Sequence, residues 1–312
     1  MPPLHVVTGA LGYTGRAVAE RLIAQGVRVR TLTNSTDRPN PFGAALDIKP
    51  LAFDDADALA RSLDGCEVLY NTYWVRFNHR LFNFERAVAN TKALFAAAKR
   101  AGVARVVHVS ILHARKADDL GYYKGKHELE LALESLGVSH AMVRPGVLFG
   151  RFDVLVNNAA WVLRRLPIFG VFGDGSYALR PMHVDDMADL MVRAGAGRED
   201  QIIDAVGVER FTYRQLVAEI SRIIGVRKPI VSVPPSAGYA VSKLVNPMVN
   251  DVIITREEIS GLMRGLLDSD QPATGSTKLT EWAEMHKAEL GVRYANEIGR
   301  RIERSKAYAD IR

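Results

Sequence analysis

The sequence predicts an α/β protein built on a doubly wound parallel sheet, with a smaller, mostly helical region after it. Short apolar runs alternate with helical patterns over the first half of the 312-residue chain, which indicates crossover units and parallel strands. A glycine-rich turn joins the first apolar run to the first helical pattern. The alternation then stops near residue 150. We therefore expect one domain over residues 1-150 and a C-terminal region over residues 151-312 that is interleaved with it.

The elements of the first half follow from the apolar runs and their boundaries. Strands are expected over residues 4–7, 27–32, 48–53, 66–70, 105–110 and 139–143. Helices are expected over residues 13–25, 55–63, 79–100 and 121–136. Gly26 ends the first helix, as glycine commonly does, and Pro50 favours an edge position for the third strand. Right-handed crossovers between these strands give the doubly wound arrangement.

The second half of the sequence is less regular. Helices are expected over residues 185–193, 211–224 and 237–249, and residues 255–308 are expected to form two or three helical pieces. The aromatic residues Trp161, Phe169 and Phe172 are more typical of core than of an apolar substrate pocket. The helix over residues 237–249 is expected to pack against its own domain, and peripheral contact with a membrane or partner is the alternative.

Composition restricts the classes of partner. The net charge is +6 and the pI is about 9.4, but the basic residues are dispersed and no basic-aromatic module is present, so we expect no nucleic acid as partner. A basic chain also suits an anionic small ligand.

The single cysteine, Cys66, excludes an internal disulfide and a cysteine metal cluster. No apolar run approaches the ~20 residues of a membrane span, and no signal peptide is recognisable, so a cytoplasmic location is expected. The sequence leaves open whether the chain forms a homo-oligomer.

The glycine-rich turn is the strongest local signal. It reads Thr8-Gly9-Ala10-Leu11-Gly12-Tyr13-Thr14-Gly15, after a strand and at the start of a helix, which is the context of a dinucleotide-binding Rossmann turn. Gly9 would allow the tight turn, Gly12 the close approach of a pyrophosphate, and Gly15 close packing of helix on strand. Free N–H groups and the helix dipole would hold the anion. The alternative is a plain strand–helix turn whose glycines are incidental.

The choice of coenzyme depends on the end of the second strand. An NAD site usually has an acid there to bind the ribose hydroxyls, whereas this chain has Thr33-Asn34-Ser35-Thr36 and no acid before Asp37. Asn34 and Ser35, helped by Arg38, can instead bind a 2′-phosphate. We therefore expect NADP in preference to NAD. The alternative is that Arg38 is only a solvated charge on a loop.

Tyr122 and Lys126 are candidate catalytic residues. They are four residues apart in an expected helix and so share one face. An unperturbed tyrosine has a pKa near ~10, too high for a good base at neutral pH, and a nearby ammonium favours the phenolate. Tyr122 would exchange a proton with a hydroxyl or carbonyl, and Lys126 would also bind the nicotinamide ribose. Tyr123 and Lys124 do not reproduce this spacing.

Together these segments make the chain resemble an extended or atypical short-chain dehydrogenase/reductase of the NAD-dependent epimerase/dehydratase superfamily, similar to the group of the dehydrogenase-like accessory subunit of respiratory complex I. The motifs that carry the resemblance are residues 8–15, 71–74, 109–110, 122–126, 144–150 and 180–186. The resemblance implies that Asp54 lies at the adenine, that Asn71 and Thr72 line the coenzyme, and that Val143, Arg144, Pro145 and Val147 flank the nicotinamide. It also implies that residues 151-312 bind substrate and that His183–Asp186 borders the cleft.

One position departs from that pattern. Related enzymes carry Ser or Thr near the end of the fifth strand, where it orients the substrate oxygen beside the tyrosine. The aligned position here is Leu112, which has no hydroxyl. Ser110 in a shifted register or His113 would have to orient the substrate instead.

The expected function is hydride transfer by an NAD(P)-dependent oxidoreductase or epimerase at a hydroxyl or carbonyl carbon of a small molecule. The alternative is a non-catalytic NAD(P)-binding accessory subunit or redox sensor. His183, Asp185 and Asp186 have no metal-ligand spacing, and no metal is expected.

Overall fold

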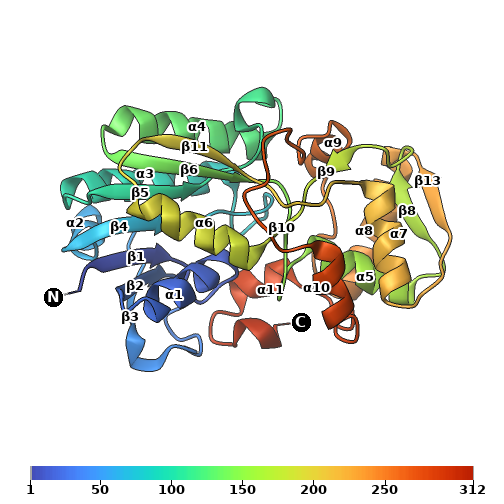
Figure 1. Cartoon of the computed structure of the whole chain (residues 1–312), viewed down its shortest axis with the longest axis horizontal. Helices are drawn as coiled ribbons and strands as arrows, with labels where there is room; N and C mark the ends of the chain where they lie inside the picture. Colours follow the sequence, from blue (N-terminus) through green and yellow to red (C-terminus); the bar gives the residue numbers. More distant parts are fainter. Residues whose placement is uncertain (1, 312) are drawn as a thin grey trace. The chain divides into compact units, whose positions relative to one another are not determined.

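A computed structural model describes residues 2–311 of the chain (Figure 1). It divides into two compact units. The first unit runs up to Arg144 and includes Met187–Asp204 from later in the chain, whereas the second consists of Pro145–Asp186 and the residues from Ala205 onward. The substrate-binding role expected for residues 151-312 stays a prediction.

The first unit is built on a seven-stranded sheet with the order β11-β6-β5-β4-β1-β2-β3. Its strands are β1 (Leu4–Thr8), β2 (Arg28–Thr33), β3 (Leu46–Pro50), β4 (Cys66–Asn71), β5 (Arg105–Val109), β6 (Ser139–Pro145) and β11 (Gln201–Ala205). The neighbours from β6 to β3 pair in parallel. The predicted doubly wound α/β class is therefore confirmed. The chain order reverses beside β1, since β2 lies on one side of it and β4 on the other, and ligands bind at such a switch point.

The predicted edge strand is also confirmed, but its boundaries were wrong. β3 lies at the end of the sheet and stops at Pro50, whereas the sequence placed the strand over residues 48–53. Proline has no N–H to donate to a ladder of hydrogen bonds, yet Pro50 is still in register with Thr33 and the Leu51 N–H donates to the Thr33 carbonyl at 3.2 Å. Pairing with β2 goes no further than this, so the strand begins and ends earlier than expected.

The helices of the first unit are α1 (Thr14–Ala24), α2 (Ala56–Arg61), α3 (Phe84–Arg100), α4 (Gly121–Leu136) and most of α6 (Val184–Ala196). The helix expected from residue 79 begins at Phe84 because Asn83 caps it, with the Asn83 carboxamide oxygen accepting the Arg86 N–H at 2.8 Å. Apolar side chains of α3 and α4, including Leu94, Phe95, Leu129 and Leu133, are buried with strand residues in one core.

The second unit has helices around short strand pairs. Its helices are α5 (Leu155–Arg165), α7 (Tyr213–Ile223), α8 (Pro235–Val249), α9 (Arg256–Met263), α10 (Leu279–His286) and α11 (Glu297–Ile302). The strand pairs are β7 (Leu148–Phe149) with β10 (Met182–His183), β9 (Ala178–Leu179) with β12 (Phe211–Thr212), and β8 (Phe169–Phe172) with β13 (Ile230–Val233). The sequence missed α5 and the short strands of this unit, and it also missed β11 of the main sheet. Phe169 and Phe172 are buried in the core of this unit. Among residues 2–311 we find no helix with the length and apolar character of a membrane span.

Candidate functional site

The glycine-rich turn folds tightly against the first two strands. Gly9 has a left-handed backbone with φ of 70°, which glycine adopts without steric cost. Its N–H donates to the Leu32 carbonyl at 3.0 Å, and the Gly12 N–H returns to the Gly9 carbonyl at 2.8 Å. A Cβ on Gly15 would lie 2.5 Å from the Gly9 carbonyl oxygen and 2.7 Å from that of Thr8. Only glycine therefore lets α1 approach the end of β1 this closely.

The N-terminus of α1 is suited to an anion. Tyr13 occupies the N-cap position and its side chain does not cap the helix, so the first N–H groups of α1 are not occupied by the usual capping side chain. No acid lies in the first turn of this 11-residue helix. Leu11 is buried, while Tyr13 and Thr14 are half-buried. This arrangement fits a dinucleotide pyrophosphate held by backbone N–H groups and the helix dipole.

Replacing Gly15 by Ala is expected to weaken NADPH binding by roughly tenfold or more, equivalent to about 1.4 kcal/mol or more. The added Cβ overlaps backbone atoms of Gly9 and Thr8, so the turn and the start of α1 must separate. Isothermal titration with NADPH measures the effect.

The matched control is Gly26→Ala at the other end of α1. Gly26 also has a positive φ, of 74°, but an added Cβ meets no atom within 4 Å. That variant should lose about 1–2 kcal/mol of stability and keep its affinity for NADPH. Equal affinity in the Gly15 variant and the wild type would contradict the proposed use of this turn.

The glycine-rich turn is anchored by hydrogen bonds of three side chains at the ends of β1 and β4, those of Thr8, Asn71 and Thr72. The Thr8 hydroxyl donates to the Asn71 side-chain oxygen at 3.1 Å and accepts the Thr72 N–H at 2.8 Å. The Thr72 hydroxyl donates to the Thr8 carbonyl at 2.6 Å. Thr8 and Asn71 are fully buried. The three residues predicted to contact the coenzyme therefore also link the end of β1 to the end of β4 by hydrogen bonds. The sequence did not predict this structural role.

His108 continues this network and was missed from the sequence. The Asn71 amide lies 3.0 Å from His108 Nδ1. Burial, and then the charge of Lys126, lower the pKa of His108 well below its usual value, so the imidazole is neutral. His108 lies on the Arg105–Val109 strand among apolar residues, and a histidine within a buried apolar run is the one sequence signal that marked it.

The residues expected around the adenosine end differ in exposure. Asn34 and Asp54 are exposed, after β2 and β3 respectively. Arg38 is only 5% exposed, so the alternative of a solvated loop charge is wrong. A buried guanidinium just beyond β2 can bind a phosphate through several N–H donors.

Tyr122 and Lys126 both pack against Trp74, which follows β4. The rings of Trp74 and Tyr122 meet edge to face with centroids 5.6 Å apart, and Lys126 Nζ lies 4.4 Å from the Trp74 ring centroid. A Cβ on Gly125 would come within 2.8 Å of the indole, so glycine at that position admits Trp74. Tyr122 and Lys126, on the same face of α4, therefore both contact the indole of Trp74.

Lys126 is deeply buried for a lysine. It is 2% exposed, and Nζ donates to the Val109 carbonyl at 2.6 Å. Burial lowers the pKa of Lys126 to about 7, with the Glu130 carboxylate acting in the opposite direction. Its protonation state therefore changes in the neutral range. Titratable groups perturbed in this way are typical of functional sites.

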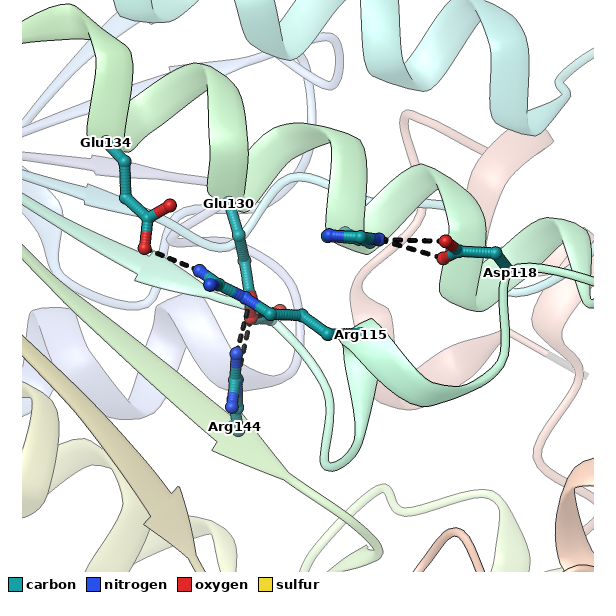
Figure 2. A network of polar contacts seen from close by, with 7 residues as sticks. Arg115, Asp118, Glu130, Glu134 and Arg144 are labelled. Atoms are coloured by element: carbon teal, nitrogen blue, oxygen red, sulfur yellow. Dashed lines mark hydrogen bonds and ion pairs between the residues drawn. The ribbon is translucent and has the colours of Figure 1, made fainter.

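Ser110 belongs to a buried polar network rather than to an open site. Its hydroxyl donates to Glu130 Oε1 at 2.6 Å, and Ser110 is 1% exposed. Arg144 of β6 also binds Glu130, with Nε 2.7 Å from Oε1, and Arg115 binds from the other side, with Nε 3.0 Å from Oε2. Figure 2 shows both arginines converging on Glu130 from different elements. The structure therefore does not bring Ser110 together with Tyr122 as an exposed pair.

Glu130 was missed from the sequence. Burial would raise the pKa of its carboxyl, but hydrogen bonds from Arg144, Ser110 and Arg115 lower that pKa below its usual value. The signal was present in the helical spacing, because Glu130 follows Lys126 by four residues and precedes the buried Leu133 by three. Charged side chains on the buried stripe of a helix require partners.

Leu112 is fully buried, so the position expected to carry a hydroxyl contributes only to the core. The next residue, His113, is half-buried and has a left-handed φ of 56°, an uncommon conformation for a residue other than glycine.

Of the other predicted residues, Val143 is buried in β6 of the first unit, and Pro145, Val147 and His183 lie in the second unit. Val147 is 5% exposed, and its carbonyl accepts the Met182 N–H at 2.9 Å. Pro145 is buried at the end of β6. The His183 ring accepts the Asp185 N–H at 3.2 Å. Among residues 2–311 we find no group of three or more side chains suited to a metal ion.

Comparison with known proteins identifies the first half of the chain. A family described as NAD(P)H-binding matches residues 9–151. The NADPH-dependent quinone oxidoreductase QOR2 of Escherichia coli, solved with NADPH, is similar in structure, with a TM-score of 0.73, 21% identity and coverage of 91% of this chain and 99% of that one. At this identity the likeness establishes the fold.

Relatives in sequence include reductases and one subunit of a respiratory complex. A (4-alkanoyl-5-oxo-2,5-dihydrofuran-3-yl)methyl phosphate reductase of Streptomyces griseus is 25% identical over 90% of this chain and 97% of its own length. A ceramide reductase of Caulobacter vibrioides is 25% identical over 77% of this chain and 76% of its own. Subunit 9 of the mitochondrial NADH dehydrogenase [ubiquinone] 1 alpha subcomplex of Arabidopsis thaliana is 24% identical over 85% and 70%.

Proposed function

We propose that this chain is an oxidoreductase or epimerase acting at a hydroxyl- or carbonyl-bearing carbon, because the NAD(P)H-binding match over residues 9–151 and the related reductases make it similar to the atypical short-chain dehydrogenase/reductase-like proteins that bind NADP or NAD. The predicted family resemblance is thereby confirmed. The observation that carries the proposed activity is the pairing of Tyr122 with Lys126, one helical turn apart on α4 and both against Trp74.

In this proposal the side chains have distinct roles. Gly9, Gly12 and Gly15 form the turn that holds the pyrophosphate. When bound, the nicotinamide coenzyme supplies or accepts the hydride. The Tyr122 phenol gives a proton to the substrate oxygen during reduction and takes it back during oxidation. Lys126 in its ammonium form stabilises the phenolate and donates to the ribose hydroxyls. The Thr8–Asn71 hydrogen bonds keep the turn in place.

The coenzyme preference is the first part of the proposal to test. We expect tighter binding of NADPH than of NADH, because Arg38 is buried beyond β2 and no acid lies among residues 33–36. Arg38→Gln should weaken NADPH binding about 10- to 100-fold, the value of a charge-assisted hydrogen bond, and leave NADH binding unchanged. Titration calorimetry with both reduced coenzymes measures this.

The matched control is Arg28→Gln, an exposed arginine at the other end of β2, which should bind both coenzymes as the wild type does. Equal wild-type affinities for NADPH and NADH would contradict the NADP preference alone. Binding of neither coenzyme would contradict the function as a whole.

The relatives suggest a class of substrate. One acts on a phosphate ester that carries an alkanoyl group, and another acts on ceramide, so both substrates carry an acyl chain next to the polar group. We propose for this chain a substrate of the same kind, a carbonyl or secondary alcohol attached to an alkyl chain. A screen of alkyl ketones and alcohols of increasing chain length, followed by the nicotinamide absorbance, is the direct assay.

A non-catalytic accessory subunit or redox sensor is the second candidate. Two observations favour it, because Leu112 is buried where related enzymes have a hydroxyl and the Ser110 hydroxyl is bound to Glu130. A relative also functions as a respiratory complex subunit. A sensor should bind its partner with different affinity in the presence of NADP and in the presence of NADPH. Equal affinity with the two coenzyme forms would count against this candidate.

A further inference from the structure

The exposed side of α8 in the second unit is almost wholly apolar. Val241 is 56% exposed, Leu244 78% and Met248 76%, and their spacing of three and four residues places them in one stripe along the helix. Apart from Ser236 and Lys243, every exposed position of this helix is apolar. Single exposed apolar residues are ordinary, but a continuous stripe marks a binding surface.

The opposite side of α8 fixes how the helix is rotated. A Cβ on Gly238 would lie 2.5 Å from the Phe172 ring and 3.2 Å from Val233, so glycine lets α8 approach β8 and β13 closely. Ser242 and Val249, on the same side as Gly238, are buried. The stripe of Val241, Leu244 and Met248 therefore stays directed to solvent and is not covered by the residues that the structure describes.

The charges around the stripe are all positive along this stretch of chain. From Arg227 to Asn250 there are three basic residues, Arg227, Lys228 and Lys243, and no acid. Tyr239 of α8 is flanked by two cations, with Lys243 Nζ 5.4 Å and the Arg256 guanidinium 4.8 Å from its ring centroid. The next acid after the helix, Asp251, is buried and accepts the N–H groups of Glu297 and Ile298.

We propose that α8 is a membrane-docking helix that lies in the plane of an anionic lipid bilayer. The apolar stripe would enter the acyl boundary, while Lys243, Arg256 and Tyr239 would meet phosphate headgroups, which is the chemistry of interfacial helices. A second copy of the chain fits this surface less well, because each copy would bring Lys243 and Arg256 against the same two cations of the other. The docking does not depend on the proposed reaction, and its test needs no substrate.

The experiment is cosedimentation of the full chain with vesicles of phosphatidylcholine alone and with added phosphatidylglycerol. The wild type should bind the anionic vesicles and be released by high salt. The variant Leu244→Glu/Met248→Glu should partition at least tenfold less. Lys243→Ala should bind about fivefold less, the effect of one cation near an anionic surface.

The matched control is Leu81→Glu/Leu131→Glu, two leucines of the first unit that are 56% and 48% exposed. It should bind vesicles as the wild type does. Both double variants should keep wild-type NADPH affinity, which separates docking from folding and from the coenzyme site. Two outcomes overturn the proposal: absence of binding to anionic vesicles, or a dimer in sedimentation velocity that the α8 variant disperses while vesicle binding is unaffected.

Discussion

Tyr122→Phe is expected to lower turnover by about 10²- to 10⁴-fold, the usual contribution of a general acid or base, while NADPH affinity changes little. The substitution removes only the phenolic oxygen and keeps the ring that packs on Trp74 and Phe84. The measurement is the initial rate of nicotinamide oxidation with the best substrate of the chain-length screen, together with an NADPH titration of the same sample.

The chain offers a control for this substitution at the adjacent position. Tyr123 is on the same helix but is 6% exposed and has no lysine four residues later, so Tyr123→Phe should retain wild-type turnover. A Tyr122 variant as fast as the wild type would remove Tyr122 from the mechanism. If the wild type itself turned over no substrate yet bound NADPH, the accessory or sensor role would become the better explanation.

Glu130→Ala is expected to destabilise the protein by about 3–5 kcal/mol, the cost of removing one partner from a buried ionic network. The Glu130 side chain is completely buried, and its carboxylate is bound by Arg144, Arg115 and Ser110 (Figure 2). Its loss leaves the half-buried Arg144 and the buried Ser110 donors without their acceptor. Urea unfolding followed by circular dichroism gives the free energy of unfolding.

Glu134→Ala is the matched control, one turn further along α4. Glu134 is 36% exposed and pairs only with Arg115 in the network drawn in Figure 2, so this loss should cost at most about 1 kcal/mol. If Glu130→Ala and Glu134→Ala lowered the free energy of unfolding equally, burial of the carboxylate would not be the reason for the large effect expected at Glu130.

The acid dependence of stability provides a second readout for Glu130. Because the folded protein holds the pKa of this carboxyl below its ordinary value of 4.5, its contribution is complete above about pH 4.5 and is lost as the pH falls through the lower, folded-state pKa. Glu130→Ala should therefore flatten the loss of stability below pH 4.5, and Glu134→Ala should not.

Much of the fold was predictable because its signals are local. Alternating strands and helices, the glycine turn and the edge position of the strand that ends at Pro50 are each set by neighbouring residues. The second unit was less predictable, since its paired strands have two to four residues and strands that short carry little periodicity. β8 and β13 pair across about 60 residues of sequence, from Phe169 to Ile230, and no local pattern encodes such a partner.

The sequence by itself determined the class of the sheet, the tight glycine-rich turn at Gly9–Gly15 and the Tyr122–Lys126 spacing, because hydrophobic period and glycine geometry act over a few residues. Only the tertiary structure decided what each polar side chain binds. It joined Ser110 to Glu130, covered Lys126 with Trp74 and buried Arg38. A hydroxyl or an ammonium has the same local propensity whether it faces a ligand or a carboxylate, and its environment exists only after distant segments have packed together.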